Sequence, residues 1–178
     1  MTYRIVPERS QLRAEARATL HSVRVQTCGF EGFVEAEVEN GQALLLLPIH
    51  VELSVARLKS GNALLDGELQ HRLEGRKFPK VIGEAREITP LEKSRFRVRA
   101  DLTLHGVTRS LQVQAAVKIL DPETLQIEGE QVIDIRDFGV DPPKLLFLRV
   151  EPRVRAYAAI VAQRESSAVR TERAMADE

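Results

Sequence analysis

The sequence predicts an all-β fold, an antiparallel eight-stranded β-barrel with one inserted α-helix. Between residues 95 and 136, apolar and polar side chains alternate along three successive runs, which is the pattern of strands with one buried face. Turn signals separate these runs, and one segment of the chain has a convincing helical pattern. Small sheets with one wet face usually close into a barrel, because closure removes their unpaired edges.

Short alternating runs also fill the N-terminal part of the chain. Strands are predicted at residues 2–6 and at residues 10–19, where small apolar side chains alternate with charged ones. Asn40-Gly41 is the strongest hairpin signal, because both residues accept the positive φ of a type I′ turn. The odd-numbered residues from Ala43 to Val55 then form one unbroken apolar face. Pro48 predicts a bulge or an edge in this strand, because proline cannot donate to a β-ladder.

The predicted helix begins after Asn62, whose side chain is suited to cap free backbone N–H groups. Asp66 and Glu68 lie near its positive end, where carboxylates are stabilised. Gly75 is expected to end the helix. Leucines recur every four residues and form an apolar packing stripe, namely Leu65, Leu69 and Leu73.

A weak strand at residues 80–88 leads into the alternating meander of residues 95–136. His105-Gly106 and Asp121-Pro122-Glu123 are its two turns, since glycine accepts positive φ and proline presets the φ of a turn position. The meander ends at a corner formed by Asp137-Phe138-Gly139.

The C-terminal part begins with Pro142 and Pro143, which predict a rigid loop. Extended segments follow at residues 145–150 and 154–160. The chain is long enough for one domain with a real core, which we expect over residues 1–163. Residues 164–178 are polar and unpatterned, and they predict a disordered C-terminal tail.

Composition narrows the classes of function. Lysine plus arginine and aspartate plus glutamate both number 26, so the net charge of zero gives no global field for nucleic acid or an anionic membrane. The single Cys28 cannot form an internal disulfide, and we expect it to be a small, buried or half-buried side chain. The four scattered histidines form no cluster with metal-ligand spacing, so neither a metal nor another cofactor is expected.

The first twenty residues are too charged for a secretory signal, and the longest apolar run, Ala43 to Ile49, is too short to span a membrane. We therefore expect a soluble, cytoplasmic protein without stable membrane insertion. A homodimer is left open.

Four short motifs in order are similar to a known family. They are Gly29-Phe30-Glu31-Gly32, Leu73-Glu74 followed by Phe78-Pro79, Leu102-Thr103-Leu104-His105-Gly106-Val107-Thr108, and Asp137-Phe138-Gly139-Val140. From Tyr3 to about Ala162 the chain resembles the bacterial YceI-like family. This resemblance implies a lipocalin-like barrel that binds isoprenoids or other long-chain amphiphiles, such as quinones or fatty-acid-like lipids.

An eight-stranded barrel is of a size at which inward side chains either fill the interior or leave room for one slender ligand. The chain has no tryptophan and only eight aromatic residues, and several alanines are predicted to face inward, which favours a cavity. Together with what the resemblance implies about the ligand, this predicts non-catalytic binding of a long-chain amphiphile, for transport, storage or sequestration. The expected ligand-binding residues are the inward ones, namely Leu45, Leu47, Ile49, Val51, Phe96, Val98, Ala100, Leu102, Leu111, Val113, Ala115, Ile133, Ile135, Phe138, Ala156 and Ala158.

Two alternatives remain open. One is a packed barrel that acts through protein partners, and the other is an enzyme that uses His21 or Arg136 on a hydrophobic small molecule. The sequence has no nucleophile elbow, no paired carboxylates on an apolar background and no phosphate-binding glycine loop, so we predict no catalytic residues. Arg136 is expected to form a structural ion pair with Asp137, the alternative being contact with a polar head group at the barrel mouth. His50 is expected to lie on the solvent side.

Overall fold

The computed structural model describes residues 1–166 and contains eleven strands, one α-helix and three short 3₁₀ helices within them. The helices are α1 (Ala63–Leu73), η1 (Pro7–Arg9), η2 (Val55–Arg57) and η3 (Ile135–Phe138). The strands are β1 (Thr2–Ile5), β2 (Gln11–Ala18), β3 (Val23–Cys28), β4 (Glu31–Glu39), β5 (Gln42–Ser54), β6 (Lys80–Pro90), β7 (Arg95–Leu104), β8 (Val107–Asp121), β9 (Thr124–Asp134), β10 (Lys144–Leu145) and β11 (Leu148–Arg164).

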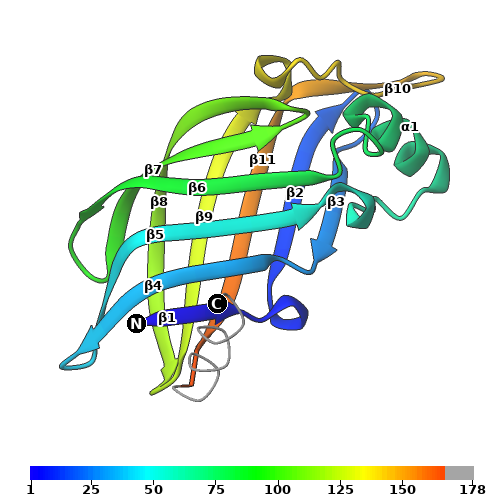
Figure 1. The fold of residues 1–178 in the computed structure, drawn as a ribbon. Coiled ribbons are helices and arrows are strands. Elements are labelled where there is room, and N and C mark those ends of the chain that lie inside the picture. The colour runs from blue at the N-terminus through cyan, green and yellow to red at the C-terminus, as the bar shows by residue number, and fades with distance from the viewer. Residues whose placement is uncertain (167–178) are drawn as a thin grey trace.

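Eight strands form a closed ring in the order β1-β4-β5-β6-β7-β8-β9-β11, with β1 paired to β11 at the closure (Figure 1). β2 pairs with the earlier part of the long β11, and β3 pairs with β2. The predicted antiparallel, eight-stranded, lipocalin-like barrel with an inserted helix is confirmed. β11 runs to Arg164, where it pairs with Tyr3. Residues 167–178 of the predicted tail lie outside the described residues.

The β4–β5 hairpin turns at Asn40-Gly41, whose φ angles are +51° and +74° as predicted. The break expected at Pro48 is also present, because Val34 pairs with Ile49 while Glu35 pairs with Leu46, which leaves two extra residues on β5. The expectation of one unbroken apolar face on this strand is wrong at Leu47. The register shift places that side chain outside, where it is 47% exposed.

Helix α1 begins at the predicted N-cap, since Asn62 Oδ1 accepts hydrogen bonds from the backbone N–H groups of Leu64 and Leu65. The predicted stop at Gly75 is wrong by one residue, because Glu74 takes the left-handed conformation with φ +48°. Gly75 is small for another reason. A Cβ atom there would lie 2.5 Å from Gln70 Oε1.

A tight hairpin interrupts the extended segment predicted for residues 145–150. Lys144 pairs with Arg149 and Leu145 with Leu148, which leaves Leu146 and Phe147 as a two-residue turn between β10 and β11. No helix within residues 1–166 is both long and apolar enough to cross a membrane.

The barrel has two unlike ends (Figure 1). We call the one with the β4–β5, β6–β7 and β8–β9 turns the hairpin end, and the one with α1, η3, β10 and the β7–β8 turn the helix end. A buried cluster packs the barrel at the hairpin end, and its members are Tyr3, Val34, Ala36, Ala43, Leu45, Phe96, Val117, Leu125 and Ala162. Two other buried clusters lie around the helix end, one including Phe30, Leu73 and Phe138 and the other Ala16, Val23, Leu65 and Val150.

Candidate ligand cavity

A cavity of about 440 Å³ lies inside the barrel between the hairpin-end cluster and α1, and nearly all atoms that face it are carbon. Its volume falls within the range of about 300–1,000 Å³ that is usual for small-molecule sites. Most of the inward residues predicted from alternation line it, namely Leu45, Ile49, Val51, Val98, Ala100, Leu102, Leu111, Val113, Ala115, Ile133, Ile135, Ala156 and Ala158. Their role in binding a ligand stays a prediction.

Small residues meet across neighbouring strands, and this pairing keeps the cavity open. Ala100 lies opposite Ala85, and Ala156 lies opposite Ala14. Gly129 on β9 is flanked by Ala115 on β8 and by Ala158 on β11, which makes a row of three small residues. Facing side chains normally fill a barrel of this size, so these pairs leave space that the longer residues around them do not reach.

Three predicted ligand-binding residues do not line the cavity. Leu47 lies on the bulge of β5, outside the barrel. Phe96 points inward but belongs to the hairpin-end cluster, below the floor of the cavity. Phe138 is buried in η3 among the helix-end residues, where it packs with Leu73 and Leu104. Ala18, which the alternation along residues 10–19 places on the same face as Ala14 and Ala16, packs beside Val150 instead.

Helix α1 supplies lining residues that the strand pattern could not identify. The predicted leucine stripe of this helix faces the cavity, and Leu58 from the preceding segment also lines the cavity. That segment runs beside β3, where Gln26 and Lys59 exchange two backbone hydrogen bonds. The leucine period identified the packing face of the helix, but it could not show that this face covers an open space. The stripe consists of Leu65, Leu69 and Leu73.

Polar contacts fix α1 over the cavity at both ends. Ser60 donates to Asp66 Oδ1 through its hydroxyl (2.6 Å) and its backbone N–H (2.7 Å), and the hydroxyl bond is the larger cause of the lowered pKa of Asp66. Near the other end, Gln70 Nε2 donates to the Val55 carbonyl oxygen at 2.7 Å. Arg72 donates to Glu68 at 2.7 Å, and this bond lowers the pKa of the Glu68 carboxyl.

His105 joins three segments at the helix end. It occupies the predicted β7–β8 turn with φ +53°, and its side chain is largely buried. Its Nδ1 lies 3.1 Å from the Phe138 carbonyl oxygen, and its Nε2 contacts the Glu74 carboxylate at the end of α1. Phe78 packs edge-on against the ring. His105 is therefore a structural link between the β7–β8 turn, η3 and α1.

The ion pair predicted between Arg136 and Asp137 is wrong. Arg136 instead donates two hydrogen bonds to Asp134, at 2.9 and 2.6 Å, and they lower the pKa of Asp134 to about 2. Asp134 also caps η3 by accepting from the Arg136 backbone N–H. The 3₁₀ turn brings residues two apart together, so Arg136 reaches back along the chain and not to its neighbour.

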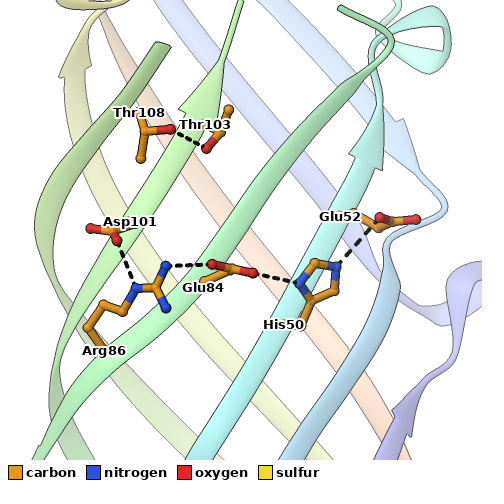
Figure 2. Close-up of polar contacts among 7 residues, drawn as sticks. All are labelled: His50, Glu52, Glu84, Arg86, Asp101, Thr103 and Thr108. Carbon is orange, nitrogen blue, oxygen red and sulfur yellow. Dashed lines mark hydrogen bonds and ion pairs between the residues drawn. The ribbon is translucent and has the colours of Figure 1, made fainter. Parts of the chain in front are cut away.

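Acidic residues beside the cavity direct their carboxylates to the outer face of the barrel, along β5, β6 and β7 (Figure 2). His50 lies 3.5 Å from both Glu52 and Glu84, and Arg86 bridges Glu84 and Asp101 with two contacts of 2.7 Å. Lys80 donates to Glu52 at 2.6 Å, which lowers the pKa of that carboxyl. The strands alternate, so these groups and the cavity occupy opposite faces.

Other polar candidates also lie away from the cavity. His21 is exposed in the β2–β3 turn, where its Nδ1 contacts the Ser22 carbonyl oxygen at 3.1 Å. Cys28 was expected to be buried or half-buried, but it is exposed at the end of β3. Within residues 1–166, no group of three or more potential ligand side chains could hold a metal ion.

Comparisons with known proteins agree with this architecture. Three solved structures share the fold at low sequence identity, and each is covered almost completely. They are a polyisoprenoid-binding domain from Saccharophagus degradans (12% identity, TM-score 0.73, 92% of this chain and 98% of that one), BcnA of Burkholderia cenocepacia (14%, 0.73, 89% and 99%) and the YceI protein of Campylobacter jejuni (14%, 0.67, 83% and 88%).

A comparison with curated proteins gives no match. The family model described as the YceI-like domain matches residues 3–162, which is nearly the whole barrel from β1 to the end of β11. The chain belongs to the YceI-like family.

Proposed function

We propose that this protein binds one long-chain amphiphile, such as an isoprenoid, a quinone or a fatty-acid-like lipid, and carries or sequesters it without chemical change. The carbon-lined cavity of about 440 Å³ carries this proposal. Transfer from water to such a lining is favourable by about 0.8 kcal/mol for each methylene group. A partly buried chain therefore gains useful affinity.

The distribution of polar groups sets the orientation of the ligand. The cavity offers the ligand almost no polar atoms. On the side of the hairpin end it is closed by packed side chains that include Tyr3, Phe96 and Leu125. A polar head group without hydrogen-bond partners would be costly to bury there. The alkyl or prenyl chain therefore points toward the hairpin end, and the head group stays at the helix end near water.

Two further observations support a carrier and not an enzyme. The carboxylates beside the cavity are engaged with His50, Lys80 and Arg86 on the outer face, so they do not face a bound chain. The Saccharophagus degradans domain that shares the fold is described as polyisoprenoid-binding.

The first experiment identifies the natural ligand. The protein is purified without detergent from a bacterial host, its bound mass is measured by native mass spectrometry, and the ligand is extracted into organic solvent for identification. We expect a stoichiometric long-chain amphiphile. An empty protein that also refuses a fluorescent long-chain fatty acid on titration would contradict the proposal and favour a role through protein partners.

A matched pair of variants tests whether the cavity is the site. Ala115→Phe fills the space beside Gly129, whereas Ala116→Phe makes the same change on the outer face of β8. We expect at least about tenfold weaker fatty-acid binding for the first variant, because the added ring takes the place of several ligand methylene groups. The second variant should bind as the wild type does. Equal affinities in both variants would place the ligand elsewhere.

A further inference from the structure

The β10–β11 turn exposes two large apolar side chains to solvent. Leu146 is 91% exposed and Phe147 is 87% exposed. They occupy both positions of a two-residue turn, so they project beyond the end of the strands that carry them. Single exposed apolar residues are common on proteins, but adjacent ones at the tip of a hairpin are typical of a surface with a partner.

The conformation of this turn argues against a purely structural role. Leu146 adopts φ +51°, which glycine and asparagine accept far more easily than leucine does. Two-residue hairpins strongly favour Asn-Gly, and this chain uses that pair at residues 40–41. The Leu146-Phe147 turn therefore departs from the local rule, and such departures are expected at functional positions.

Two other exposed leucines lie on segments that contact β10 or β11. Thr19 and Arg149 exchange two hydrogen bonds of 3.1 Å, which brings the exposed Leu20 beside the start of β11. α1 packs beside β10, and its exposed Leu64 points away from the cavity on the first turn of the helix.

Two cations flank the apolar tip. Lys144 and Arg149 are paired across the two strands, directly behind the turn, and both are exposed. Neither forms an ion pair within residues 1–166, whereas Lys80, Arg86 and Arg136 are all paired. Exposed apolar side chains can insert at the acyl boundary of a bilayer, and cations without ion-pair partners are attracted to anionic head groups. The tip therefore has both features that favour an anionic bilayer.

We propose that the helix end docks on the surface of an anionic lipid bilayer, with Leu146 and Phe147 inserted at the interface, Leu20 and Leu64 beside them, and Lys144 and Arg149 at the head groups. The cavity reaches close to this surface, since buried Leu65, Pro143 and Val150, on segments next to the turn, line it. Docking would let an amphiphile pass between bilayer and cavity with little exposure to water. This use rests on the proposed function, although the docking itself does not.

A bilayer fits this surface better than a second copy of the chain does. Stable protein interfaces involve about 20–30 residues on each side and a flat, complementary contact. Here four apolar side chains stand on three separate segments, and the cations of two copies would repel each other.

Binding to lipid vesicles tests the proposal. The wild type is sedimented with vesicles of phosphatidylcholine alone and with vesicles that also contain phosphatidylserine, and we expect binding to the second kind. The test variant is Leu146→Asn with Phe147→Gly, which installs the turn pair that the β4–β5 hairpin already tolerates. We expect vesicle binding to weaken by at least about tenfold, because two large apolar groups no longer leave water. Leu120→Asn, which changes an exposed leucine on β8 near the hairpin end, is the matched control and should bind as the wild type does.

A second variant tests the cations. Lys144→Gln with Arg149→Gln should reduce the preference for phosphatidylserine and the sensitivity to salt. No vesicle binding by the wild type, or equal binding by wild type and tip variant, would overturn the proposal. A wild-type dimer in light scattering that the tip variant abolishes would also overturn it, in favour of a second copy.

Titration with a fluorescent long-chain fatty acid in the absence of vesicles separates this proposal from the proposed function. The tip variant should keep the fatty-acid affinity of the wild type. Fatty-acid uptake without vesicle binding would overturn the docking surface and leave the carrier function intact. Vesicle binding that depends on the tip, without any uptake, would support the docking surface and contradict the carrier function.

Discussion

The two ends of the barrel share strands and alternation but differ in how they are filled. At the hairpin end, Tyr3, Phe96 and Leu125 belong to one buried cluster, and none of them is more than 3% exposed. Toward the helix end, the same strand β7 that carries Phe96 presents Ala100, which lies opposite Ala85 on β6. An alternating pattern that places apolar residues inside therefore does not decide whether a barrel of this size is packed or hollow. The size of the inward residue at each level along the axis decides it.

The turns at the two ends differ as well. Asn40-Gly41 at the hairpin end follows Glu39, whereas Leu146-Phe147 at the helix end is flanked by Lys144 and Arg149. A net charge of zero over the whole chain conceals this contrast. The global charge gives no attraction to an anionic membrane, but a bilayer docked as proposed would be affected mainly by the charges at one end of the molecule.

Removing the packed floor should have the largest effect. Phe96→Ala deletes a ring that is 3% exposed, and we expect a loss of about 3–5 kcal/mol in the free energy of unfolding, measured by urea titration. The variant should also lengthen the cavity toward the hairpin end. Val98→Ala is the control on the same strand, and its loss should be smaller because Val98 already borders empty space. Equal losses would mean that the two ends are packed alike.

Alternation along single strands was enough to predict the ring and most inward residues, but it could not locate them along the axis. Phe96 and Val98 have the same parity on β7, yet one lies in the packed floor and the other in the cavity wall. Their depth depends on the pairing of β7 with β6 and β8, which no single run of residues reveals. Leu47 shows a second limit, since two extra residues on β5 leave the parity of the strand intact while placing the side chain outside.

Local signals were predictable where they depend on nearby backbone alone. Asn62 and Asn40-Gly41 act as predicted, because a cap and a two-residue turn are satisfied within a few residues. The end of α1 and the partner of Arg136 were not predicted correctly, because each depends on the exact path of the chain. The hairpin at Leu146-Phe147 could not be predicted at all, since its residues have no turn preference.

The link at His105 tests whether the helix end is stabilised separately. His105→Ala removes the contacts to Phe138 and Glu74 and leaves a largely buried carbonyl without its partner, so we expect a loss of about 1–3 kcal/mol. Hydrogen exchange should accelerate in α1 and η3 and stay unchanged in the β4–β5 hairpin. The exposed His21, changed to alanine, is the control and should leave stability unchanged. Equal acceleration at both ends would show that they unfold as one unit.

The helix cap gives a smaller and more local effect. Asn62→Ala removes the acceptor of two backbone N–H groups, and we expect about 1 kcal/mol less stability. Asn62→Ser keeps a capping oxygen and should restore most of it. Hydrogen exchange of α1 and the rate of fatty-acid uptake are the measurements. If uptake is unchanged while α1 exchanges faster, the ligand enters without movement of the helix.

The smallest expected effect is a pH dependence of the stability of α1, because the carboxyl groups involved are partly exposed and their interactions are screened by solvent. Hydrogen bonds from Ser60 hold the pKa of Asp66 below its ordinary value of 3.8. Arg72 on the same helix, and to a smaller extent the Lys144 backbone of β10, hold the pKa of Glu68 below its ordinary value of 4.5, and the Lys144 contact joins α1 to β10. A carboxyl with a lowered folded-state pKa adds stability that is complete above its unfolded pKa and is lost as the pH falls through the folded one. The attachment of α1 should therefore be intact at neutral pH and weaken progressively below about pH 4.5.

Hydrogen exchange of α1 between pH 5 and pH 3, corrected for the intrinsic pH dependence of exchange, measures this change. Asp66→Asn with Glu68→Gln should be less protected than the wild type at neutral pH and should show a flatter pH profile, since neither new side chain titrates. A wild-type profile as flat as that of the variant would mean that these carboxyls do not attach the helix. Hydrophobic contact through Leu65 and Leu73 would then hold α1 over the cavity unaided, and the helix end would resemble the hairpin end more closely than its polar contacts indicate.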